Sequence, residues 1–305
     1  MSDRASTGVA VSVVVPTRDR AAYLSVTLAS VAAQRLAEPF EVVVVDDGSR
    51  DAEVARVAAS AGAACERHPV SRGPNAARNT GIAAARAPLV VLIDDDVRAP
   101  AGWLAALVEG AGRHGWAEAL GGPIRASLEG PAPRACGREP APITTLDHGR
   151  ADREVEAVWS ANMAVRRSAV ERVGRFDESV PIYGDEEEWV MRLRAGGGRV
   201  AYVAAAGLEH RRAGDDARLR SLARAEYRRG RAARRSGERK GDAPSVPREL
   251  RDLAGAVWHT GRRRCPLGVA MVAHSGGRLL EVARRSPRGP AESPARGPTG
   301  APGPR

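Results

Sequence analysis

The sequence predicts an α/β fold in which a doubly wound, mostly parallel sheet is followed by a C-terminal helical extension. Short β-branched runs such as VSVVV alternate with segments whose apolar residues recur at helical spacing. The connections between them are short, as they are where helices link the strands of a parallel sheet. The alternation ends near residue 116, and the last third of the chain is basic with helical segments.

The elements of the sheet follow in order from their local patterns. Continuous apolar runs that suit a sheet buried on both faces predict strands over 11–15, 40–49 and 89–93. Amphipathic spacing predicts helices over 21–34, 51–62, 75–87 and 101–115. Gly62 is a suitable C-cap for the second helix.

Beyond these elements the pattern changes. Residues 129–157 are rich in Pro, Gly and charge, which predicts a long loop near the site. A short helix over 168–174 and a second helix that begins at the acidic turn 184–188 come next. Two strands, near 158–165 and 199–203, flank these helices.

Charge is distributed unevenly along the chain, whose net charge is +10. Residues 211–240 carry twelve Arg or Lys against four Asp or Glu, whereas residues 1–210 carry 24 against 28. A uniformly basic nucleic-acid-binding protein would not have an acidic body, so we expect no nucleic-acid partner. No apolar run reaches the roughly 18 residues of a membrane span, and the N-terminus does not resemble a signal peptide. We therefore expect a cytoplasmic protein.

The C-terminal third offers two alternatives. A basic amphipathic helix over 216–235 could lie on the anionic inner face of a membrane, or its small apolar stripe could pack on the rest of the protein. Residues 250–284 are helical but too interrupted to span a bilayer, and could form an interfacial hairpin or a dimer contact. Oligomeric state stays open. Composition predicts a flexible N-terminus over 1–8 and a disordered Pro/Gly-rich tail over 286–305.

The three cysteines are far apart in the sequence. Cys65, Cys136 and Cys265 are odd in number and show no metal-ligand spacing. Their positions predict neither a disulfide framework nor a zinc site.

Polar clusters follow the expected strands. PTRDR follows the first, DDGS (46–49) the second, and Asp94, Asp95 and Asp96 follow 89–93. Ligands bind outside the carboxyl ends of strands in such sheets, so these clusters should share one crevice. Gly73 and Pro74 begin a helix whose first turn suits an anion such as a diphosphate. No G-x-G-x-x-G or P-loop motif follows a strand.

Seven motifs in order resemble those of the family 2 glycosyltransferases. They are VSVVVPTRDR, VVVVDDGS, GPNAARNTG, VLIDDDV, SANMAVRR, VGRFDE and YGDEEEWVMRLRAGG. The resemblance covers about residues 9–210 and implies a GT-A fold, a Rossmann-like domain that binds nucleotide-diphospho-sugars. The helical extension then covers 211–285. The resemblance also implies an inverting transferase that uses Mg²⁺ or Mn²⁺ and moves a sugar to a glycan, lipid-linked or small-molecule hydroxyl.

The resemblance implies a metal site and a donor site. Asp96 is expected to be the main metal ligand, with Asp94 toward the metal or the ribose and Asp95 beside the donor. His210 is expected to complete the metal site; a solvated loop histidine is the alternative. Two further groups of residues are expected to contact the nucleotide, namely Pro16, Thr17, Arg18, Asp46 and Asp47 at the nucleoside, and Arg78 at the phosphates.

Among these residues Asp47 is the preferred contact to the base, and a strand-end turn is the structural alternative for the pair Asp46 and Asp47. The catalytic base is expected in the segment Gly184-Asp185-Glu186, where the family usually has Gly-Glu-Asp. Glu186 takes the position of the base, with Asp185 or Glu187 as alternatives. Acidic residues that favour a helix N-terminus are the structural alternative. The altered motif also allows a nucleotide-sugar-binding protein without catalysis; a nucleotidyltransferase lacks support, because no glycine- and lysine-rich loop follows the first strand.

Overall fold

The computed structural model describes residues 8–134, 136, 142–180 and 185–285, with the backbone alone at residues 185 and 285. The expected flexible N-terminus and disordered tail fall almost wholly outside these residues. The strands are β1 (Val11–Thr17), β2 (Phe40–Asp46), β3 (Ala64–Arg67), β4 (Leu89–Ile93), β5 (Val97–Arg98), β6 (Ala119–Gly121), β7 (Ile124–Leu128), β8 (Arg153–Val155), β9 (Asn162–Arg166), β10 (Val200–Tyr202) and β11 (Leu208–Arg212). The helices are α1 (Ala21–Ala32), α2 (Glu53–Ser60), α3 (Pro74–Ala84), α4 (Trp103–Arg113), α5 (Arg167–Val173), α6 (Asp185–Ala195), the 3₁₀ turn η1 (Gly214–Ala217), α7 (Leu219–Lys240), α8 (Val246–Arg262) and α9 (Gly268–Arg285).

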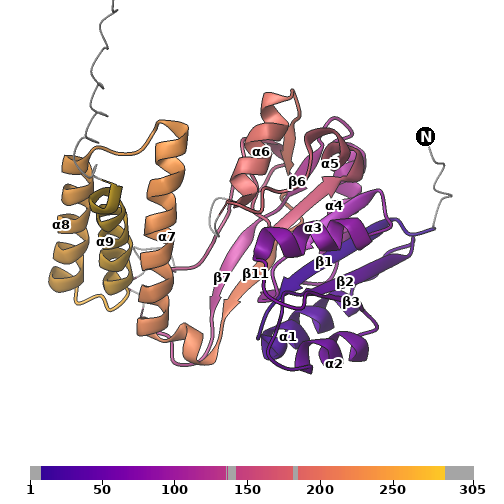
Figure 1. Ribbon diagram of the computed structural model, residues 1–305, viewed down its shortest axis with the longest axis horizontal. Coiled ribbons are helices and arrows are strands. Elements are labelled where there is room, and N and C mark those ends of the chain that lie inside the picture. The colour runs from indigo at the N-terminus through magenta and orange to yellow at the C-terminus, as the bar shows by residue number, and fades with distance from the viewer. Residues whose placement is uncertain (1–7, 135, 137–141, 181–184, 286–305) are drawn as a thin grey trace, which may run out of the picture.

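An eight-stranded sheet forms the centre of the molecule, in the order β3-β2-β1-β4-β9-β6-β10-β8. Strands β1 to β4 are mutually parallel, β10 is parallel to β6, and only β9 and β8 run antiparallel to their neighbours. A smaller sheet, β5-β11-β7, lies beside it. The expectation of a doubly wound, mostly parallel sheet is confirmed (Figure 1).

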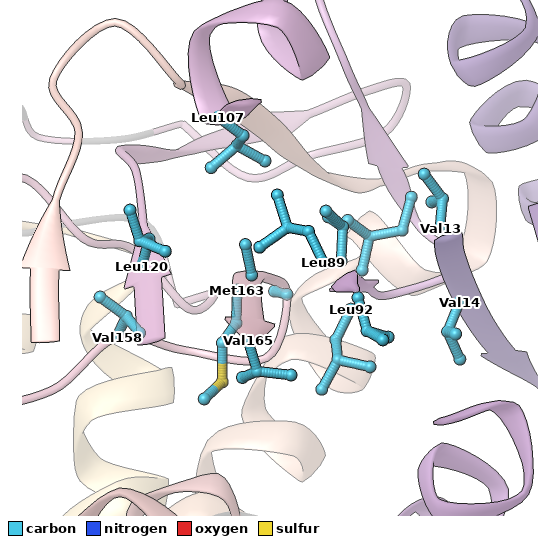
Figure 2. Packing of buried hydrophobic residues seen from close by; sticks show 14 of the residues in the cluster. Val13, Val14, Leu89, Leu92, Leu107, Leu120, Val158, Met163 and Val165 are labelled. Carbon is cyan, nitrogen blue, oxygen red and sulfur yellow. The ribbon is translucent and has the colours of Figure 1, made fainter. Parts of the chain in front are cut away.

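Aliphatic side chains from adjacent strands fill the core. Val13, Val14, Leu92 and Met163 are completely buried, and Figure 2 shows them beside one another across β1, β4 and β9. Helix α3 packs directly on β1: a Cβ on Gly81 would lie 2.2 Å from Val14 Cγ1. This packing fixes where the helix begins relative to the ends of the strands.

Three of the differences from the sequence-based expectation concern strands. The strand expected over 40–49 ends at Asp46, because Asp46 Oδ1 accepts the Ser49 N–H at 2.8 Å and Gly48 has φ +73°. The loop expected over 129–157 contains β8, which pairs with β10. The strand expected from residue 158 begins only at Asn162.

The C-terminal helices pack on one another, and Figure 1 shows them as a unit apart from the main sheet. Glycines allow the close approach of α7 and α9, since a Cβ on Gly230 would lie 2.0 Å from the His274 carbonyl oxygen. Leu222 of α7 is buried with Cys265 and Leu267. The apolar stripe of the basic helix therefore packs inside the protein. Among the described helices none is both long and apolar enough to cross a membrane.

Candidate active site

A cavity of about 550 Å³ lies at the carboxyl ends of β1, β2 and β4. Its walls come from segments that are far apart in the sequence. Ten of the expected site residues line it, namely Pro16, Thr17, Arg18, Asp47, Arg78, Asp94, Asp95, Asp96, Glu186 and His210. The topology of a parallel sheet explains this convergence, because successive strands end at the same edge.

The three aspartates that follow β4 have different partners. Asp95 is buried and accepts hydrogen bonds from the Thr17 hydroxyl and from Arg20 Nη1, each at 2.6 Å. Asp94 is partly open to the cavity and lies 3.8 Å from Arg78. Asp95 thus ties the end of β4 to β1, while Asp94 faces the space that a ligand would fill.

Asp96 is buried among cations. It accepts hydrogen bonds from Arg20 Nη2 at 2.9 Å and from Arg212, and its Oδ1 lies 2.9 Å from His210 Nε2. The small sheet creates this contact: His210 in β11 pairs with Val97 in β5, the residue after Asp96. The side-chain ligand atoms of Asp94, Asp96 and His210 all lie within 4.8 Å of one another.

The orientation of His210 favours a cation between its ring and Asp96. Nδ1 lies 3.3 Å from the Thr144 carbonyl oxygen, which can only accept, so Nδ1 carries the hydrogen. In a neutral ring Nε2 then presents a lone pair to Asp96 Oδ1. That buried oxygen has no hydrogen-bond partner among the described residues. Nε2 lies 2.9 Å from this oxygen, and either a proton on Nε2 or a metal ion bound by both atoms would join the two groups. The donor set therefore fits a divalent cation.

Crowding separates the pKa values of the three carboxyl groups. Burial raises the pKa of Asp95 to about 7, with Asp96 adding to the rise and Arg20 opposing it. Burial and the Asp96 charge likewise raise the pKa of Asp94. Burial also acts to raise the pKa of Asp96, but His210, Arg212 and Arg20 together hold it well below its ordinary value. Asp96 is therefore the carboxylate that stays ionised, as a principal metal ligand must.

Asp47 organises the loop between β3 and α3. Its carboxylate accepts hydrogen bonds from His68 Nδ1, the Ser71 hydroxyl and the backbone N–H groups of Arg72 and Gly73, at 2.7 to 2.9 Å. Burial acts to raise its pKa, but these donors lower it overall. The side chain still lines the cavity. Asp46 does not; it is fully buried in the turn to Ser49.

Helix α3 directs its N-terminus to the cavity. Gly73 (φ +95°) precedes Pro74 at the first helical position, as expected from the sequence, and both line the cavity with Ala77 and Arg78. Arg78 is buried and donates to Asn75 Oδ1 at 3.0 Å. A helix N-terminus beside an oriented arginine is a suitable place for a phosphate group.

The acidic side chains at the start of α6 have different surroundings. Glu186 lines the cavity. Glu187 instead accepts hydrogen bonds from the Ser236 hydroxyl at 2.7 Å and from Lys240, both on α7. Glu188 pairs with Arg192 in its own helix. The side chain of Asp185 lies outside the described part of the structure. Of the described carboxylates in this segment, Glu186 is the one that reaches the cavity.

Several cavity residues were not singled out from the sequence. Arg20 lies in the quoted PTRDR segment, and Arg212 lies two residues after His210, where strand periodicity places it on the same face. Ser160 begins the quoted SANMAVRR motif, whereas Trp159 and Thr144 come from segments expected as strand and loop, and no local pattern marks them. The periodicity of a strand could therefore have indicated Arg212 from its spacing to His210. The sequence has no comparable signal for cavity residues such as Trp159 and Thr144 that lie in loops.

Comparisons with known proteins agree with this site. The model of the family described as Glycosyl transferase family 2 matches residues 12–174, which is more than half of the chain. The chain belongs to glycosyltransferase family 2. It is 34% identical over 210 residues to the pre-mycofactocin glycosyltransferase of Mycobacterium tuberculosis, covering 66% of this chain and 42% of that protein. The chain thus spans less than half the length of this curated relative.

Solved structures share the fold of this family 2 protein. The mannosyltransferase PcManGT from Pyrobaculum calidifontis, in complex with GDP-Man and Mn²⁺, superposes with a TM-score of 0.56 at 19% identity, covering 91% of this chain and 76% of that one. GalNAc-T7 with UDP, GalNAc and Mn²⁺ gives a TM-score of 0.55 at 15% identity, covering 75% and 48%. These likenesses establish the GT-A fold.

Proposed function

We propose that this family 2 protein is a metal-dependent inverting glycosyltransferase that moves a sugar from a nucleotide-diphospho-sugar to an acceptor hydroxyl. The observation that supports it most is the convergence of Asp94, Asp96 and His210 within 4.8 Å, at a cavity that Glu186 and Arg78 also line. The cavity therefore contains candidate ligands for a cation, a candidate donor to a diphosphate and a candidate catalytic base. The two solved relatives were crystallised with Mn²⁺ and a uridine or guanosine nucleotide.

The candidate metal ligands are Asp96, Asp94 and His210, and the ion is Mg²⁺ or Mn²⁺. Carboxylate oxygens suit both ions, and the imidazole ligand favours Mn²⁺. When bound, such a cation stabilises the negative charge that develops on the departing nucleoside diphosphate. Arg20 and Arg212 hold Asp96 in place through Oδ2, and Arg212 Nη1 also lies 3.4 Å from His210 Nε2.

The donor is oriented by three groups of this chain. Arg78 and the N-terminus of α3 bind the diphosphate, because charge-assisted donors and free N–H groups converge there. Pro16, Thr17 and Arg18 lie along the nucleoside, and Asp47 lies toward the base. Since four protein donors already bind Asp47, its contribution to the base is shared with the backbone of the loop that it holds. The base and sugar stay open, because the two relatives contain different nucleotides.

Glu186 is the candidate base. It takes the proton of the acceptor hydroxyl as the oxygen attacks the anomeric carbon from the face opposite the leaving diphosphate, which inverts that carbon. Glutamate in place of the more usual aspartate moves the carboxylate outward by one methylene. The acceptor hydroxyl must then bind correspondingly farther from α6.

Thermal-shift and transfer assays test this function. UDP-, GDP- and dTDP-sugars are screened with and without Mn²⁺; a matching donor at 100 times its dissociation constant should stabilise the protein by about 2.7 kcal/mol. Glu186→Gln should keep metal-dependent donor binding but lose transfer and donor hydrolysis, whereas Glu187→Gln keeps them. Normal turnover by Glu186→Gln would disprove the base assignment. Donor binding without turnover by the wild type would favour the non-catalytic alternative.

We further propose that α8 brings the enzyme to an anionic membrane surface. Val246, Leu250, Val257 and Trp258 are 42 to 60% exposed, and with 3.6 residues per turn they fall on one side of the helix. Exposed Arg251 and Arg262 border this apolar side. An apolar face with an arginine border suits the interface of anionic lipids, and the acceptor would then be lipid-linked.

Vesicle co-sedimentation tests the membrane contact. Vesicles of phosphatidylcholine with phosphatidylglycerol should bind the full chain, and pure phosphatidylcholine should bind it less. Trp258→Ala with Leu250→Ser should release the protein, while Met191→Ala, an equally exposed apolar residue on α6, should not. Equal binding by the α8 variant would disprove the contact. Its conversion from a dimer to a monomer in light scattering would assign the face to a second copy instead.

A further inference from the structure

Two of the three cysteines converge with a histidine, away from the donor cavity. The Sγ atoms of Cys136 and Cys265 and a ring nitrogen of His259 all lie within 4.8 Å of one another. Cys136 Sγ is 3.5 Å from His259 Nε2. The sequence spacing predicts no metal site here, because Cys136 is far from the other two residues along the chain. In the folded protein the three side chains lie together.

We propose that Cys136, His259 and Cys265 bind a thiophilic divalent cation, with Zn²⁺ as the natural occupant. Two thiolates and an imidazole form a ligand set that zinc prefers and that Mg²⁺ and Mn²⁺ do not. In a tetrahedral site with Zn–S of about 2.3 Å and Zn–N of about 2.05 Å, sulfur and nitrogen ligands are ~3.5 Å apart. The separation of Cys136 Sγ and His259 Nε2 has this value. A water molecule or another ligand would complete the tetrahedron.

The region of the turn between α8 and α9 supplies two of the three ligands. His259 lies in the last turn of α8, and the chain reverses through Arg264, which adopts φ +47° although it is not glycine. The Cys265 N–H then bonds back to the Thr260 carbonyl at 3.2 Å. This reversal brings Cys265 toward His259 and buries it behind Leu222. A left-handed arginine is an uncommon conformation, and a bound metal would offset its cost.

Cys136 supplies the third ligand from the segment between β7 and β8. The same segment carries Thr144, whose carbonyl oxygen accepts from His210 Nδ1 and whose hydroxyl lies 3.4 Å from Arg229 Nη2. A metal at Cys136 would tie this segment to the α8–α9 turn at one end, while Thr144 contacts the donor cavity. We infer a structural role: the ion holds the wall of the cavity against the C-terminal helices.

Cobalt titration of the full, reduced chain tests the site. Co²⁺ bound by thiolates gives a near-ultraviolet charge-transfer absorption that carboxylate and imidazole ligands do not give. We expect this absorption to saturate at one equivalent and to be removed by Zn²⁺. Cys136→Ser, at an exposed position, should abolish it and should weaken Zn²⁺ binding by roughly 100-fold or more. His259→Gln should weaken it as well.

Two control variants test whether the thiolate absorption comes from this site. Cys65→Ser removes a cysteine on β3, away from the cluster, and should leave the absorption unchanged. Asp96→Asn disables the acidic site and should also leave it unchanged, so failure of one site is distinguishable from failure of the other. Absence of the thiolate absorption, or its persistence in Cys136→Ser, would overturn the proposal. So would a Cys136–Cys265 disulfide found by mass spectrometry in the protein purified without reductant.

Discussion

Buried carboxylates surrounded by arginines occur in two regions of this molecule, with different consequences. In the C-terminal helices Glu249 is fully buried between Arg234 and Arg278, and Glu281 lies between Arg231 and Arg235. At the end of β4 three adjacent carboxylates share their arginines and face a cavity. The carboxylates of the C-terminal helices are surrounded by arginines, which always carry hydrogens to donate. In the second region, Asp96 Oδ1 faces His210 Nε2 at 2.9 Å.

The difference shows that burial and ion pairing do not by themselves identify a functional carboxylate. Arginine is always protonated, so Arg234 and Arg278 balance the Glu249 charge without a ligand, although Glu249 Oε2 has no hydrogen-bond partner among the described residues. A carboxylate oxygen that lies against a histidine nitrogen beside a cavity can instead share a metal cation with that nitrogen. Single substitutions in each region test this difference.

Asp96→Asn should have the largest effect. It keeps the side-chain volume but removes the charge that the proposed metal site requires. We expect transfer to fall by ~10³-fold, comparable with the loss of a major electrostatic group in other active sites. The melting temperature without ligands should change less than for loss of the whole side chain, because the amide oxygen introduced by the substitution can still accept from Arg20 and Arg212, and Arg20 keeps its pair with Asp95. Steady-state transfer assays over a Mn²⁺ series measure the effect; wild-type rates at saturating Mn²⁺ would argue against a metal role.

Glu249→Ala should destabilise the protein by about 3 kcal/mol, since it removes the buried carboxylate that pairs with Arg278 and Arg234, of which Arg234 keeps its contact with Glu238. Urea denaturation followed by circular dichroism measures this change. The Mn²⁺ concentration for half-maximal donor binding should stay at the wild-type value. A shift in that concentration would show that the two regions are not independent.

His210→Ala should weaken Mn²⁺ binding by roughly 10- to 100-fold while leaving nucleotide binding without metal unchanged. Asp94 and Asp96 remain, so some metal binding should survive. Calorimetric titration of Mn²⁺ into the protein with a nucleoside diphosphate compares the variant with His114→Ala, a histidine that pairs with Asp152 outside the cavity. Equal affinity in both variants would leave His210 as a purely structural residue.

Glu187→Ala should have the smallest effect, below about 1 kcal/mol on unfolding, because its contacts with Ser236 and Lys240 are partly exposed. Transfer activity should be preserved. A loss of activity as large as that of Glu186→Gln would return Glu187 to the list of candidate bases.

Much of the fold followed from the sequence because its strong signals are local. Continuous apolar strands such as 11–15 and 89–93, and the helix start at Gly73 and Pro74, depend on neighbouring residues alone. The short strands β5 and β8 and the later start of β9 do not, because they exist through pairing with distant segments. A strand of two or three residues has no period of its own to detect.

The candidate site divides in the same way. Asp94, Asp95 and Asp96 stand at a recognisable strand end, so their gathering with Thr17 and Arg78 could be predicted. The pairing of Arg20 with Asp95, and the departure of Glu187 toward α7, depend on how helices orient after packing. The Cys136, His259 and Cys265 cluster lay beyond sequence reasoning, because only the docking of a loop on the C-terminal helices brings it together.

Asp94, Asp96 and His210 are proposed to hold a divalent cation together with a donor diphosphate. Electron paramagnetic resonance of free Mn²⁺, titrated with protein in the presence of UDP or GDP, tests it most directly. We expect the wild type to deplete the free-ion signal beyond what nucleotide alone achieves, and Asp96→Asn not to do so. Identical depletion by both proteins would contradict it.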